Sequence, residues 1–240
     1  MTDGMRWVRN TRTGGWFQIA EADYKPSSKD RQIQANADEA ARLNNENRRQ
    51  EAGKHADALI AGAHKVEPQV TKDLQEVVQS DNAKLAGLEY RFKGKDSLTD
   101  KLERKAVEKG ITVEQYSKRV TDVLRYTEMS KENDLYRNFN SFVDKMSARG
   151  YTMVECTNTW YDGSVYKGIN TLMRTKDGYV FEMQFHTARS LEIKEINHKL
   201  YEKGRALGVS QAMKDKYELE MKKNAMSVST PLNVGKIKSF

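Results

Sequence analysis

The sequence of 240 residues contains one cysteine, three prolines and four histidines, and it has no long hydrophobic run. A single cysteine, Cys156, cannot form an internal disulfide, and together with scattered histidines it gives no recognisable zinc-ligand spacing. Neither a stretch of about 18 apolar residues nor a signal-peptide core is present, so no membrane segment is predicted. We therefore expect a cytoplasmic protein with no structural metal and no membrane partner.

The sequence is rich in charged residues and comparatively poor in apolar ones. Charged residues make up 31% of the chain and hydrophobic residues 38%, with a mean hydropathy of −0.83. Lysine and arginine number 41 against 34 acidic residues, which gives a net charge of +7 and a pI near 9.2. This surplus favours polyanionic partners such as nucleotides, RNA or DNA, although a surplus of this size can also serve solubility alone.

The two ends of the chain are expected to lie outside the main domain. Residues 1–28 indicate a strand or hairpin followed by a linker, because Gly-Gly and Pro-Ser-Ser interrupt a short apolar run. Residues 29–68 favour a polar helical arm, which Pro68 should end or kink. We assign residues 69–208 to the folded domain and residues 209–240 to a C-terminal helix and polar tail.

Within the folded domain, strand patterns and helix patterns alternate along the chain. The expected strands are 90–94, 119–129, 151–160, 165–175 and 179–187. The expected helices are 69–88, 97–110 with Ser97 as N-cap, 135–150 and 189–207. Asp-Gly pairs at 162–163 and 177–178 favour antiparallel hairpins. The predicted fold is α+β, with a mixed, mostly antiparallel sheet of about five strands flanked by helices and an N-terminal helical extension.

Polar side chains occupy one face of several predicted strands. In "YVFEMQFHT" the apolar residues fall on one side, and Glu182, Gln184 and His186 fall on the other. Asp122 lies among apolar neighbours that suggest a central strand. If the strands around Asp122 and Glu182 are neighbours, two carboxylates converge, and like charges that close are tolerated mainly with a divalent cation between them.

Basic residues precede this acidic pair. "YRFKGKDS" supplies Arg91 and Lys93, and the following helix carries Lys101 and Lys105 one turn apart. Neighbouring cations on one helix face are explained by an anion between them. Two carboxylates, Mg²⁺ and a basic cluster are the components of phosphoryl transfer.

The order of these motifs resembles the synthetase domain of RelA/SpoT proteins, which are ATP:nucleotide pyrophosphokinases that make ppGpp and pppGpp. The motifs are R-x-K, an aspartate on a strand, Y-x-G-x-N, E-x-Q-x-H-T and a helix with His198. The phrases "DVLRYTEM", "YKGIN", "FEMQFHT" and "INHKLYEKGR" are similar to a divergent branch found in toxins and phage-associated proteins. The resemblance covers residues 85–208 and implies a nucleotidyltransferase-like fold.

The resemblance also implies a role for each motif residue. Asp122 and Glu182 would bind Mg²⁺, or Glu182 would orient the attacking ribose 3′-hydroxyl with support from Gln184. The phosphates of the donor ATP would be held by Arg91, Lys93, Lys101, Lys105 and Arg125. The acceptor would contact Tyr166, Gly168, Asn170 and His186, with the Tyr166 ring stacked on its base.

Three positions depart from the family pattern. Arg125 follows Asp122 by three residues instead of five, Asn170 replaces a histidine, and His186 replaces an arginine. Each departure falls at an acceptor or phosphate contact, so the fold is better supported than the substrate. No histidine-aspartate segment precedes the domain, so a hydrolase activity is not expected.

The leading hypothesis is a Mg²⁺-dependent transferase that moves pyrophosphate from ATP to the ribose 3′-hydroxyl of a purine nucleotide or of an RNA 3′ end such as that of tRNA. It would act as a toxin or effector in the cytoplasm of a bacterial host, with an antitoxin as a partner. The alternative is a non-enzymatic phage-associated protein, carried in the particle, that uses a degenerate domain for binding. A metal-independent ribonuclease that uses His186 and Glu182 is a third hypothesis.

Structural explanations of the same residues also remain open. Asp122 could be the buried partner of Arg91 or Arg125. Glu182 and His186 could lie on a solvated sheet face, and Lys101 and Lys105 on a wet helix face. His198 could be a packing histidine.

Overall fold

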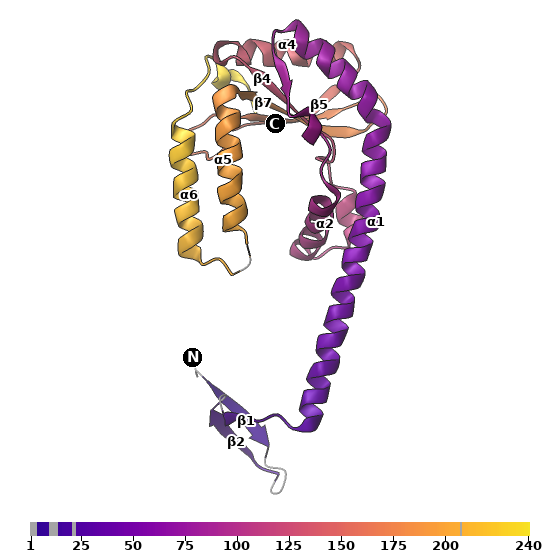
Figure 1. Cartoon of the computed structure of the whole chain (residues 1–240), viewed down its shortest axis with the longest axis vertical. Helices are drawn as coiled ribbons and strands as arrows, with labels where there is room; N and C mark the ends of the chain where they lie inside the picture. The colour runs from indigo at the N-terminus through magenta and orange to yellow at the C-terminus, as the bar shows by residue number, and fades with distance from the viewer. Residues whose placement is uncertain (1–3, 10–13, 21–22, 207) are drawn as a thin grey trace. The chain divides into compact units, whose positions relative to one another are not determined.

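A computed structural model describes residues 4–9, 14–20, 23–206 and 208–240. The chain divides into two units, Met1–Gln50 and Glu51–Phe240 (Figure 1). In the first unit, β1 (Met5–Arg9) and β2 (Trp16–Ala20) pair as an antiparallel hairpin, which confirms the hairpin predicted before residue 28. The hairpin precedes the first part of α1 (Ser28–Ser80).

Helix α1 is continuous where two helices were expected. Pro68 lies inside it, so the prediction that this proline ends a helical arm is wrong. Buried residues line the helix on both sides of Pro68, among them Ala56, Ala63, Val70 and Leu74. The apolar area that they bury offsets the hydrogen bond that proline removes from a helix interior.

The second unit is built on a sheet in the order β3-β4-β7-β6-β5. Its strands are β3 (Lys84–Ala86), β4 (Arg125–Ser130), β5 (Thr152–Asn158), β6 (Ile169–Arg174) and β7 (Val180–Thr187). Strands β4 and β7 pair in parallel, and the other neighbours pair antiparallel. The prediction of a mixed, mostly antiparallel sheet of about five strands is therefore confirmed.

Helices flank this sheet as predicted. They are α2 (Lys95–Lys109), α3 (Val113–Ser117), α4 (Leu135–Ala148), α5 (Ala188–Gly204) and α6 (Gln211–Met226). Single 3-10 turns lie at Leu88–Tyr90, Glu132–Asp134 and Val234–Lys236. None of the helices in the described part of the chain is both long and apolar enough to cross a membrane.

Two predicted strands and one helix start are corrected. The 90–94 segment forms only an isolated bridge, Phe92 to Leu124, and β4 begins at Arg125, so Asp122 precedes the strand on which it was placed. Helix α2 begins at Lys95 with Gly94 as its N-cap, because the Leu98 N–H already donates to the Gly94 carbonyl at 2.9 Å. Ser97 therefore lies in the first turn of the helix.

The closed face of the sheet packs against α1 and α4. Phe181, Met183 and Phe185 of β7 are fully buried on this face. The Phe185 ring meets Phe139 and Phe142 of α4 edge to face, each at 5.0 Å between ring centroids. Such contacts add to the hydrophobic stabilisation of the core.

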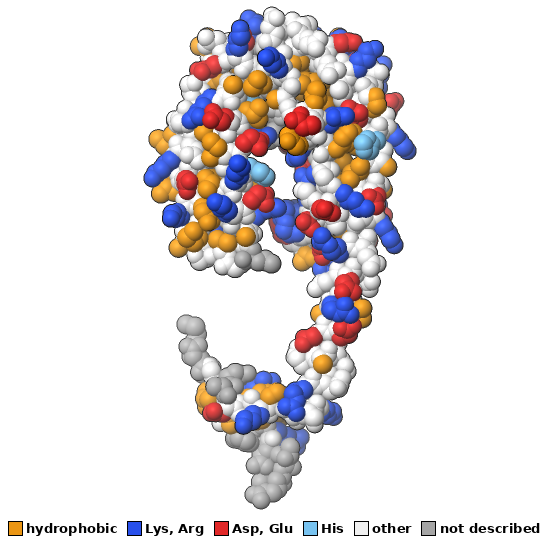
Figure 2. Space-filling view, viewed as in Figure 1, with side chains coloured by type: hydrophobic (Ala, Val, Ile, Leu, Met, Phe, Trp, Pro, Cys, Tyr) orange, Lys and Arg blue, Asp and Glu red, His pale blue; other side chains and the backbone are white. Residues whose placement is uncertain are grey.

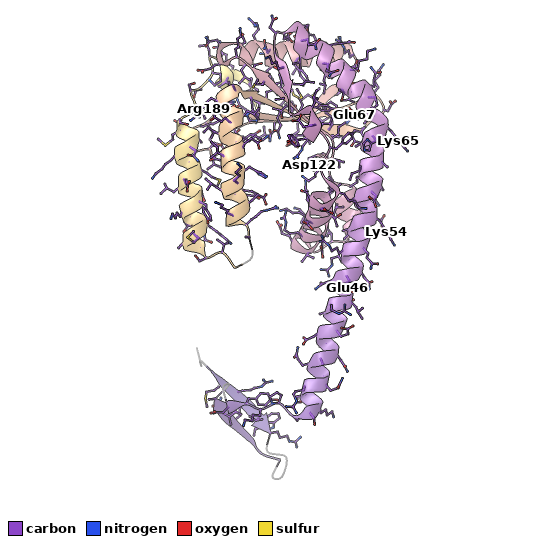
Figure 3. All side chains as sticks on the ribbon, viewed as in Figure 1. Glu46, Lys54, Lys65, Glu67, Asp122 and Arg189 are labelled. Atoms are coloured by element: carbon purple, nitrogen blue, oxygen red, sulfur yellow. The ribbon has the colours of Figure 1, made fainter. Side chains whose placement is uncertain are left out.

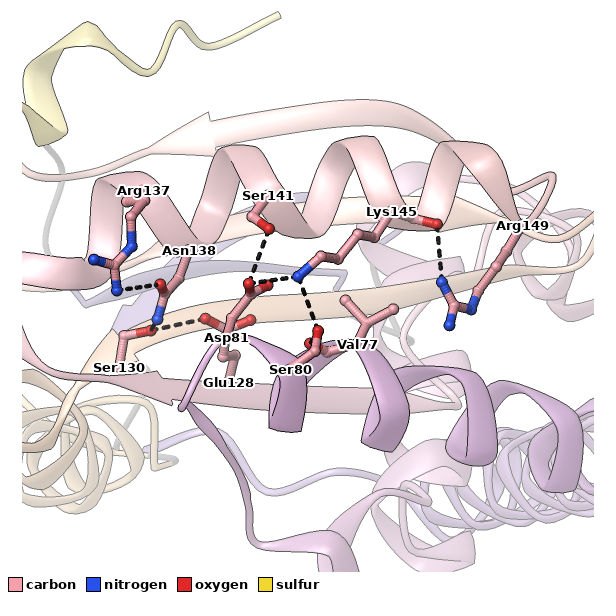
Figure 4. Close-up of polar contacts among 10 residues, drawn as sticks. All are labelled: Val77, Ser80, Asp81, Glu128, Ser130, Arg137, Asn138, Ser141, Lys145 and Arg149. Carbon is pink, nitrogen blue, oxygen red and sulfur yellow. Dashed lines mark hydrogen bonds and ion pairs between the residues drawn. The ribbon is translucent and has the colours of Figure 1, made fainter.

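Polar groups at one end of the closed face are joined by hydrogen bonds (Figure 4). Ser130 donates to the buried Glu128 carboxyl at 2.8 Å and accepts from Asn138 at 2.9 Å. Lys145 and Ser141 of α4 both donate to Asp81, which follows α1. Burial raises the pKa of Glu128 to about 7, because the charged form loses its hydration.

The open face of the sheet is partly covered by α5. Helix α5 follows β7 directly through a capping box in which Thr187 and Ser190 bond each other's backbone N–H groups. It contacts β4 and β7 and pairs with α6. Figure 2 shows a hollow between the α5–α6 pair and α2, with charged side chains along it.

Candidate active site

The strand register brings polar side chains from three strands together on the open face. Glu182 of β7 lies between Arg125 of β4 and Leu172 of β6, and Gln184 lies between Thr127 and Asn170. Residues directly opposite each other in a sheet share a face. The register therefore places Glu182, Gln184 and Asn170 on one face of the sheet.

A pocket of about 530 Å³ opens over this face, beneath α5. It is lined by Ala86, Gly87, Tyr90, Arg125, Thr127, Gln184, Leu191, Lys194, Glu195 and His198. A cavity of this volume is in the range of small-molecule sites. Its charged groups are two cations, Arg125 and Lys194, and one carboxylate, Glu195, in addition to the titratable His198.

Two polar groups of β7 lack protein partners here. The Oε1 atom of Gln184 is buried and accepts no hydrogen bond from any described residue, although the side chain lines the pocket. The Glu182 carboxylate likewise makes no hydrogen bond or ion pair with a described residue. A buried acceptor left unpaired costs about 1–3 kcal/mol, so the Gln184 Oε1 atom points to a ligand or an ordered water. Glu182 is only partly buried, so water can hydrate its carboxylate.

His186 and Tyr166 form a closed pair at the end of the same face. His186 is fully buried; its Nε2 lies 2.8 Å from the Tyr166 hydroxyl and its Nδ1 lies 2.9 Å from Ser190 Oγ. The Tyr166 hydroxyl also donates to Asn170 Oδ1 at 2.6 Å. Burial, with a smaller effect from the nearby charge of Lys194, lowers the pKa of His186 to about 3. The imidazole is therefore neutral and held by its neighbours.

This pair explains the glycine of the Y-x-G-x-N motif. A Cβ on Gly168 would lie 2.5 Å from His186 Cε1 and 2.9 Å from Tyr166 Cε1. The space that the glycine leaves is filled by these two rings of the same chain. The solvated-face explanation of His186 is wrong, and a ribonuclease that uses this histidine as an acid or base does not fit its burial.

Asp122 lies before β4, between the sheet and α2 (Figure 3). Its two carboxylate oxygens accept one hydrogen bond each, from Lys93 Nζ at 3.0 Å and from Lys101 Nζ at 2.7 Å. Burial opposes the charged form, but the hydrogen bond from Lys101 and the charges of both lysines outweigh it and hold the pKa of this carboxyl below its ordinary value. The ion-pair partners of Asp122 are thus Lys93 and Lys101. The alternative that Asp122 pairs with Arg91 or Arg125 is wrong.

The other predicted phosphate-binding cations also have acidic partners. Arg91 Nε donates to Glu67 of α1 at 2.6 Å, and Lys105 pairs with Glu108 at 2.8 Å. Lys101 and Lys105 therefore each bond a different carboxylate, where a shared anion was expected. A triphosphate that binds this cluster would have to replace these carboxylates as the partner of the cations.

Backbone hydrogen bonds connect the basic cluster to the open face. The Arg125 N–H donates to the Arg91 carbonyl at 2.9 Å, and the Lys93 N–H donates to the Val123 carbonyl at 2.9 Å. The Glu182 N–H in turn donates to the Leu124 carbonyl at 3.0 Å. The segment that carries Arg91 and Lys93 therefore runs alongside the segment that carries Arg125, which is the neighbour of Glu182.

The carboxylates of this site fit a magnesium ion that binds together with substrate phosphates. The described residues contain no cluster of three or more histidine, cysteine or acidic side chains that could hold a metal. Magnesium is commonly held by one or two carboxylates and by substrate phosphates. Glu182 fits that arrangement because its carboxylate makes no hydrogen bond or ion pair with a described residue, whereas Asp122 would first have to release a lysine. The residues fit a magnesium ion that arrives with a nucleotide, and they do not form a preformed metal cage.

Some pocket residues were not found from the sequence. Leu191, Lys194, Glu195 and His198 recur at positions i, i+3, i+4 and i+7 of α5, which places them on one helix face. This spacing, in a helix directly after E-x-Q-x-H-T, was the available signal. His198 was considered as a packing residue, but its side chain is 62% exposed at the pocket.

Comparison with known proteins supports the fold. No family model and no curated protein matches the sequence. Small alarmone synthetase 1 from Bacillus subtilis, solved bound to its product pppGpp, aligns over 72% of this chain and 90% of its own at 14% identity, with a TM-score of 0.51. A second structure of that protein aligns over 71% and 88%, at 14% identity and a TM-score of 0.50.

A type VI effector, Tas1, solved in complex with its immunity protein, aligns over 78% of this chain and 96% of its own at 15% identity. Its TM-score of 0.43 is too low to support a shared toxin role. The synthetase alignments, together with the sheet order and the ordered motifs, establish the architecture. The protein has the RelA/SpoT-like synthetase fold that its motifs predict.

Proposed function

We propose that the protein transfers pyrophosphate from ATP to the ribose 3′-hydroxyl of a nucleotide or of an RNA 3′ end. The observation that carries this proposal is the buried, unpaired Gln184 Oε1 atom beside Glu182, whose carboxylate makes no hydrogen bond with a described residue, on a strand that lines a pocket next to a basic cluster. A synthetase of the same fold has been solved with pppGpp, a product of this kind of transfer. The fold alone does not specify an activity.

The donor would bind at Arg91, Lys93 and Lys101. These cations already hold carboxylates in an arrangement that phosphate oxygens can replace, since both are anionic oxygen acceptors. Release of Asp122 by its lysines would free a second carboxylate near the phosphates. A bound magnesium ion would supply neutralisation of phosphate charge.

The acceptor would lie along β7. Successive residues on one strand face are about 7 Å apart, which matches the reach from a ribose 3′-oxygen to the edge of its base. Glu182 would then meet the ribose, and the Gln184 amide would meet a base edge that presents a donor beside an acceptor. The Tyr166 ring, fixed through its hydroxyl, would border the same base.

The chemical step follows from this placement. The 3′-oxygen attacks the β-phosphorus of ATP, and an O–P bond forms. The bond from that phosphorus to the oxygen that bridges to the α-phosphorus breaks, and AMP leaves with the bonding electrons. The hydroxyl proton passes to the Glu182 carboxylate, which lies on this face and accepts no hydrogen bond from a described residue.

A radiolabel assay tests the reaction. The full chain is incubated with Mg²⁺, γ-labelled ATP and, in separate reactions, GDP, GTP, ATP or tRNA. Label should move to at least one acceptor. Glu182→Gln should lower the rate by roughly 10²–10⁴-fold, the usual contribution of a positioned base. Glu192→Gln is the matched control, because Glu192 is exposed and, among the described residues, forms an ion pair with Arg189 alone. No labelled acceptor, or equal rates for the two variants, would refute the proposal.

Gln184→Leu separates acceptor recognition from catalysis. It removes the orphan acceptor while it keeps the volume of the side chain, so the KM for the acceptor should rise about tenfold or more and the KM for ATP should change little. An unchanged KM for the acceptor would show that Gln184 does not contact it.

A non-enzymatic role in a phage particle is the second candidate. Two observations favour it: the first part of α1 is polar and almost fully exposed, and Arg91, Lys93, Lys101 and Lys105 are all ion-paired. Detection of the chain in purified particles, with no thermal shift on addition of Mg²⁺ and ATP, would favour this role. Growth arrest on expression, relieved by a neighbouring gene product, would instead favour a toxin with its antitoxin.

A further inference from the structure

A cation in the pocket beneath α5 has no partner among the described residues. Arg125, at the start of β4, is partly buried and lines the pocket, and its guanidinium makes no hydrogen bond or ion pair within the described part of the chain. A guanidinium carries five N–H donors, and most buried polar atoms have a hydrogen-bond partner. The pairing of β4 with β7 fixes the Arg125 backbone, so the fold keeps this side chain at the pocket without a protein acceptor.

A second cation, Lys194 of α5, lines the same pocket and is only 26% exposed. Glu195 forms an ion pair with it at 3.6 Å, but the Glu195 side chain is 63% exposed, and exposed pairs contribute little. Burial is the largest cause that lowers the pKa of Lys194 below its ordinary value, and the charge of Arg125 acts in the same direction. The carboxylates of Glu195 and Glu182 oppose this shift without cancelling it. The fold therefore places two cations in one pocket at an electrostatic cost.

Arg125 and Lys194, which we call the pocket cations, differ from the basic cluster near α2. In that cluster Arg91, Lys93 and Lys101 each donate to a carboxylate at 3.0 Å or less. An anion that enters the cluster must displace one of these carboxylates. The pocket cations present less competition, because the only carboxylate paired with either of them in the described chain is mostly exposed. The pocket is therefore the better prepared of the two places for an anion.

The surroundings of the pocket cations indicate which anion fits. The same pocket contains the unpaired Gln184 Oε1 atom, which can accept from the N–H of a base. It also contains the Tyr90 ring, which is 70% exposed and can stack on a base. Cations, an amide acceptor and an aromatic ring around about 530 Å³ match the phosphate and the base of one nucleotide. A small inorganic anion would leave the amide and the ring unused.

The strand register assigns this nucleotide to the acceptor side of the proposed reaction. Arg125 is the direct neighbour of Glu182 across β4 and β7, and Glu182 is the proposed base for the ribose 3′-hydroxyl. The 5′-phosphate is carried by the same ribose as that hydroxyl. A ribose at Glu182 therefore brings its own 5′-phosphate close to Arg125, while the donor phosphates have separate cations in the basic cluster.

We propose that Arg125 and Lys194 bind the 5′-phosphate group of the acceptor nucleotide, and that Lys194 sets the preference for a phosphorylated acceptor over its nucleoside. The identity of this ligand as the acceptor rests on the proposed transfer reaction. The anion site itself needs neither ATP nor Mg²⁺. A phosphate between the pocket cations would offset the electrostatic cost of placing them together.

Titration calorimetry on the full chain, without ATP or Mg²⁺, tests the anion site. GDP and ADP should bind roughly tenfold or more tightly than guanosine and adenosine, because hydrogen bonds between charged groups are the strong ones. Inorganic pyrophosphate alone should also bind. Equal affinities for the nucleotides and their nucleosides would refute the proposal, and so would the absence of binding by pyrophosphate and by both nucleotides.

Lys194→Met keeps the aliphatic stem of the side chain and removes its charge. Affinity for GDP and ADP should fall roughly tenfold or more, affinity for the nucleosides should not change, and Lys194→Arg should restore most of the loss. Lys199→Met is the matched control, because Lys199 is exposed on the same helix and does not line the pocket. Equal nucleotide affinity in Lys194→Met and the parent would refute the role of Lys194.

Thermal unfolding without nucleotide separates this role from a structural one. Because burial and Arg125 disfavour the charge of Lys194, Lys194→Met should unfold at a temperature no lower than the parent. A lysine that mainly stabilises the fold would give a lower unfolding temperature, and that result would contradict the proposal.

The labelled transfer assay distinguishes the acceptor from the donor. Lys194→Met should raise the KM for the acceptor and leave the KM for ATP little changed. A rise in the KM for ATP alone would place the donor in the pocket and overturn the acceptor assignment. Transfer with unchanged kinetics in Lys194→Met would refute this inference and leave the proposed enzyme intact. Lys194-dependent binding of GDP or ADP with no transfer to any acceptor would refute the enzyme and keep the anion site.

Discussion

The two faces of β7 differ in what surrounds their side chains, because alternate residues of the strand point to opposite faces. On the closed face, Phe181 and Phe185 are buried against helices, and the nearby Glu128 has its hydrogen-bond partner. On the open face, Glu182 and the Oε1 atom of Gln184 have none among the described residues. The closed face provides stability. Since an unpaired buried acceptor destabilises a fold, the Gln184 Oε1 atom supports our proposal that the open face binds a ligand.

Removal of Phe185 should show the stabilising face most strongly. Phe185→Ala deletes a fully buried ring with two aromatic contacts, so the free energy of unfolding should fall by about 3–5 kcal/mol in urea titrations. Ile196→Ala, at an exposed position of α5, should change it by no more than about 0.5 kcal/mol. Similar losses in the two variants would contradict the division of the strand into two faces.

Glu128 gives the closed face a distinctive pH dependence. Its pKa is raised from 4.5 to about 7 by burial, so the folded state favours the protonated carboxyl. The contribution of Glu128 to the free energy of unfolding is therefore fully present below pH 4.5, and it is lost as the pH rises toward 7. Above that range the cost to the free energy of unfolding is about 3 kcal/mol.

Glu128→Gln removes this titration and keeps an acceptor for Ser130. The variant should be more stable than the parent at about pH 8 and close to it at about pH 4.5. Denaturant titrations at the two values measure the difference. If the difference in the free energy of unfolding between parent and variant is the same at the two pH values, Glu128 has the same pKa in the folded and unfolded states, which would contradict the prediction.

Tyr166 has structural hydrogen bonds and a proposed contact with the acceptor base. Its substitution should have the smallest effect on the free energy of unfolding. Tyr166→Phe loses the bonds to Asn170 and His186, which should cost about 1 kcal/mol of unfolding free energy, but it keeps the ring. Acceptor affinity should then persist in Tyr166→Phe and fall in Tyr166→Leu if the ring stacks on a base. Equal affinities for the two variants would assign Tyr166 a structural role alone.

The sequence was sufficient for the strands whose side chains alternate clearly. The period of two in 179–187 predicts both the buried face and the polar face of β7, and Asp-Gly at 177–178 predicts its hairpin with β6. The same reasoning misplaced Asp122, because the apolar residues Val120, Val123 and Leu124 imitate a strand. In the described structure Leu124 forms an isolated bridge with Phe92, and Val123 accepts a single backbone hydrogen bond from Lys93. Asp122 is held by lysines from distant positions.

Long-range partners account for the other differences. The pairing of Arg91 with Glu67, which is 24 residues away, cannot be read from local spacing. Gly168 was predicted to leave space for a ligand, and the pattern could not show that His186 and Tyr166 fill that space. Pro68 lies within a helix because buried residues on both sides of it compensate, which a local helix rule does not consider.

The most direct measurement compares one acceptor with its 3′-deoxy analogue in the presence of Mg²⁺ and γ-labelled ATP. If the open face of β7 is a transferase site, label should appear on the acceptor that has a 3′-hydroxyl, one AMP should form for each transfer, and the 3′-deoxy analogue should receive none. Label released only as free phosphate or pyrophosphate, at the same rate with either acceptor, would contradict the account.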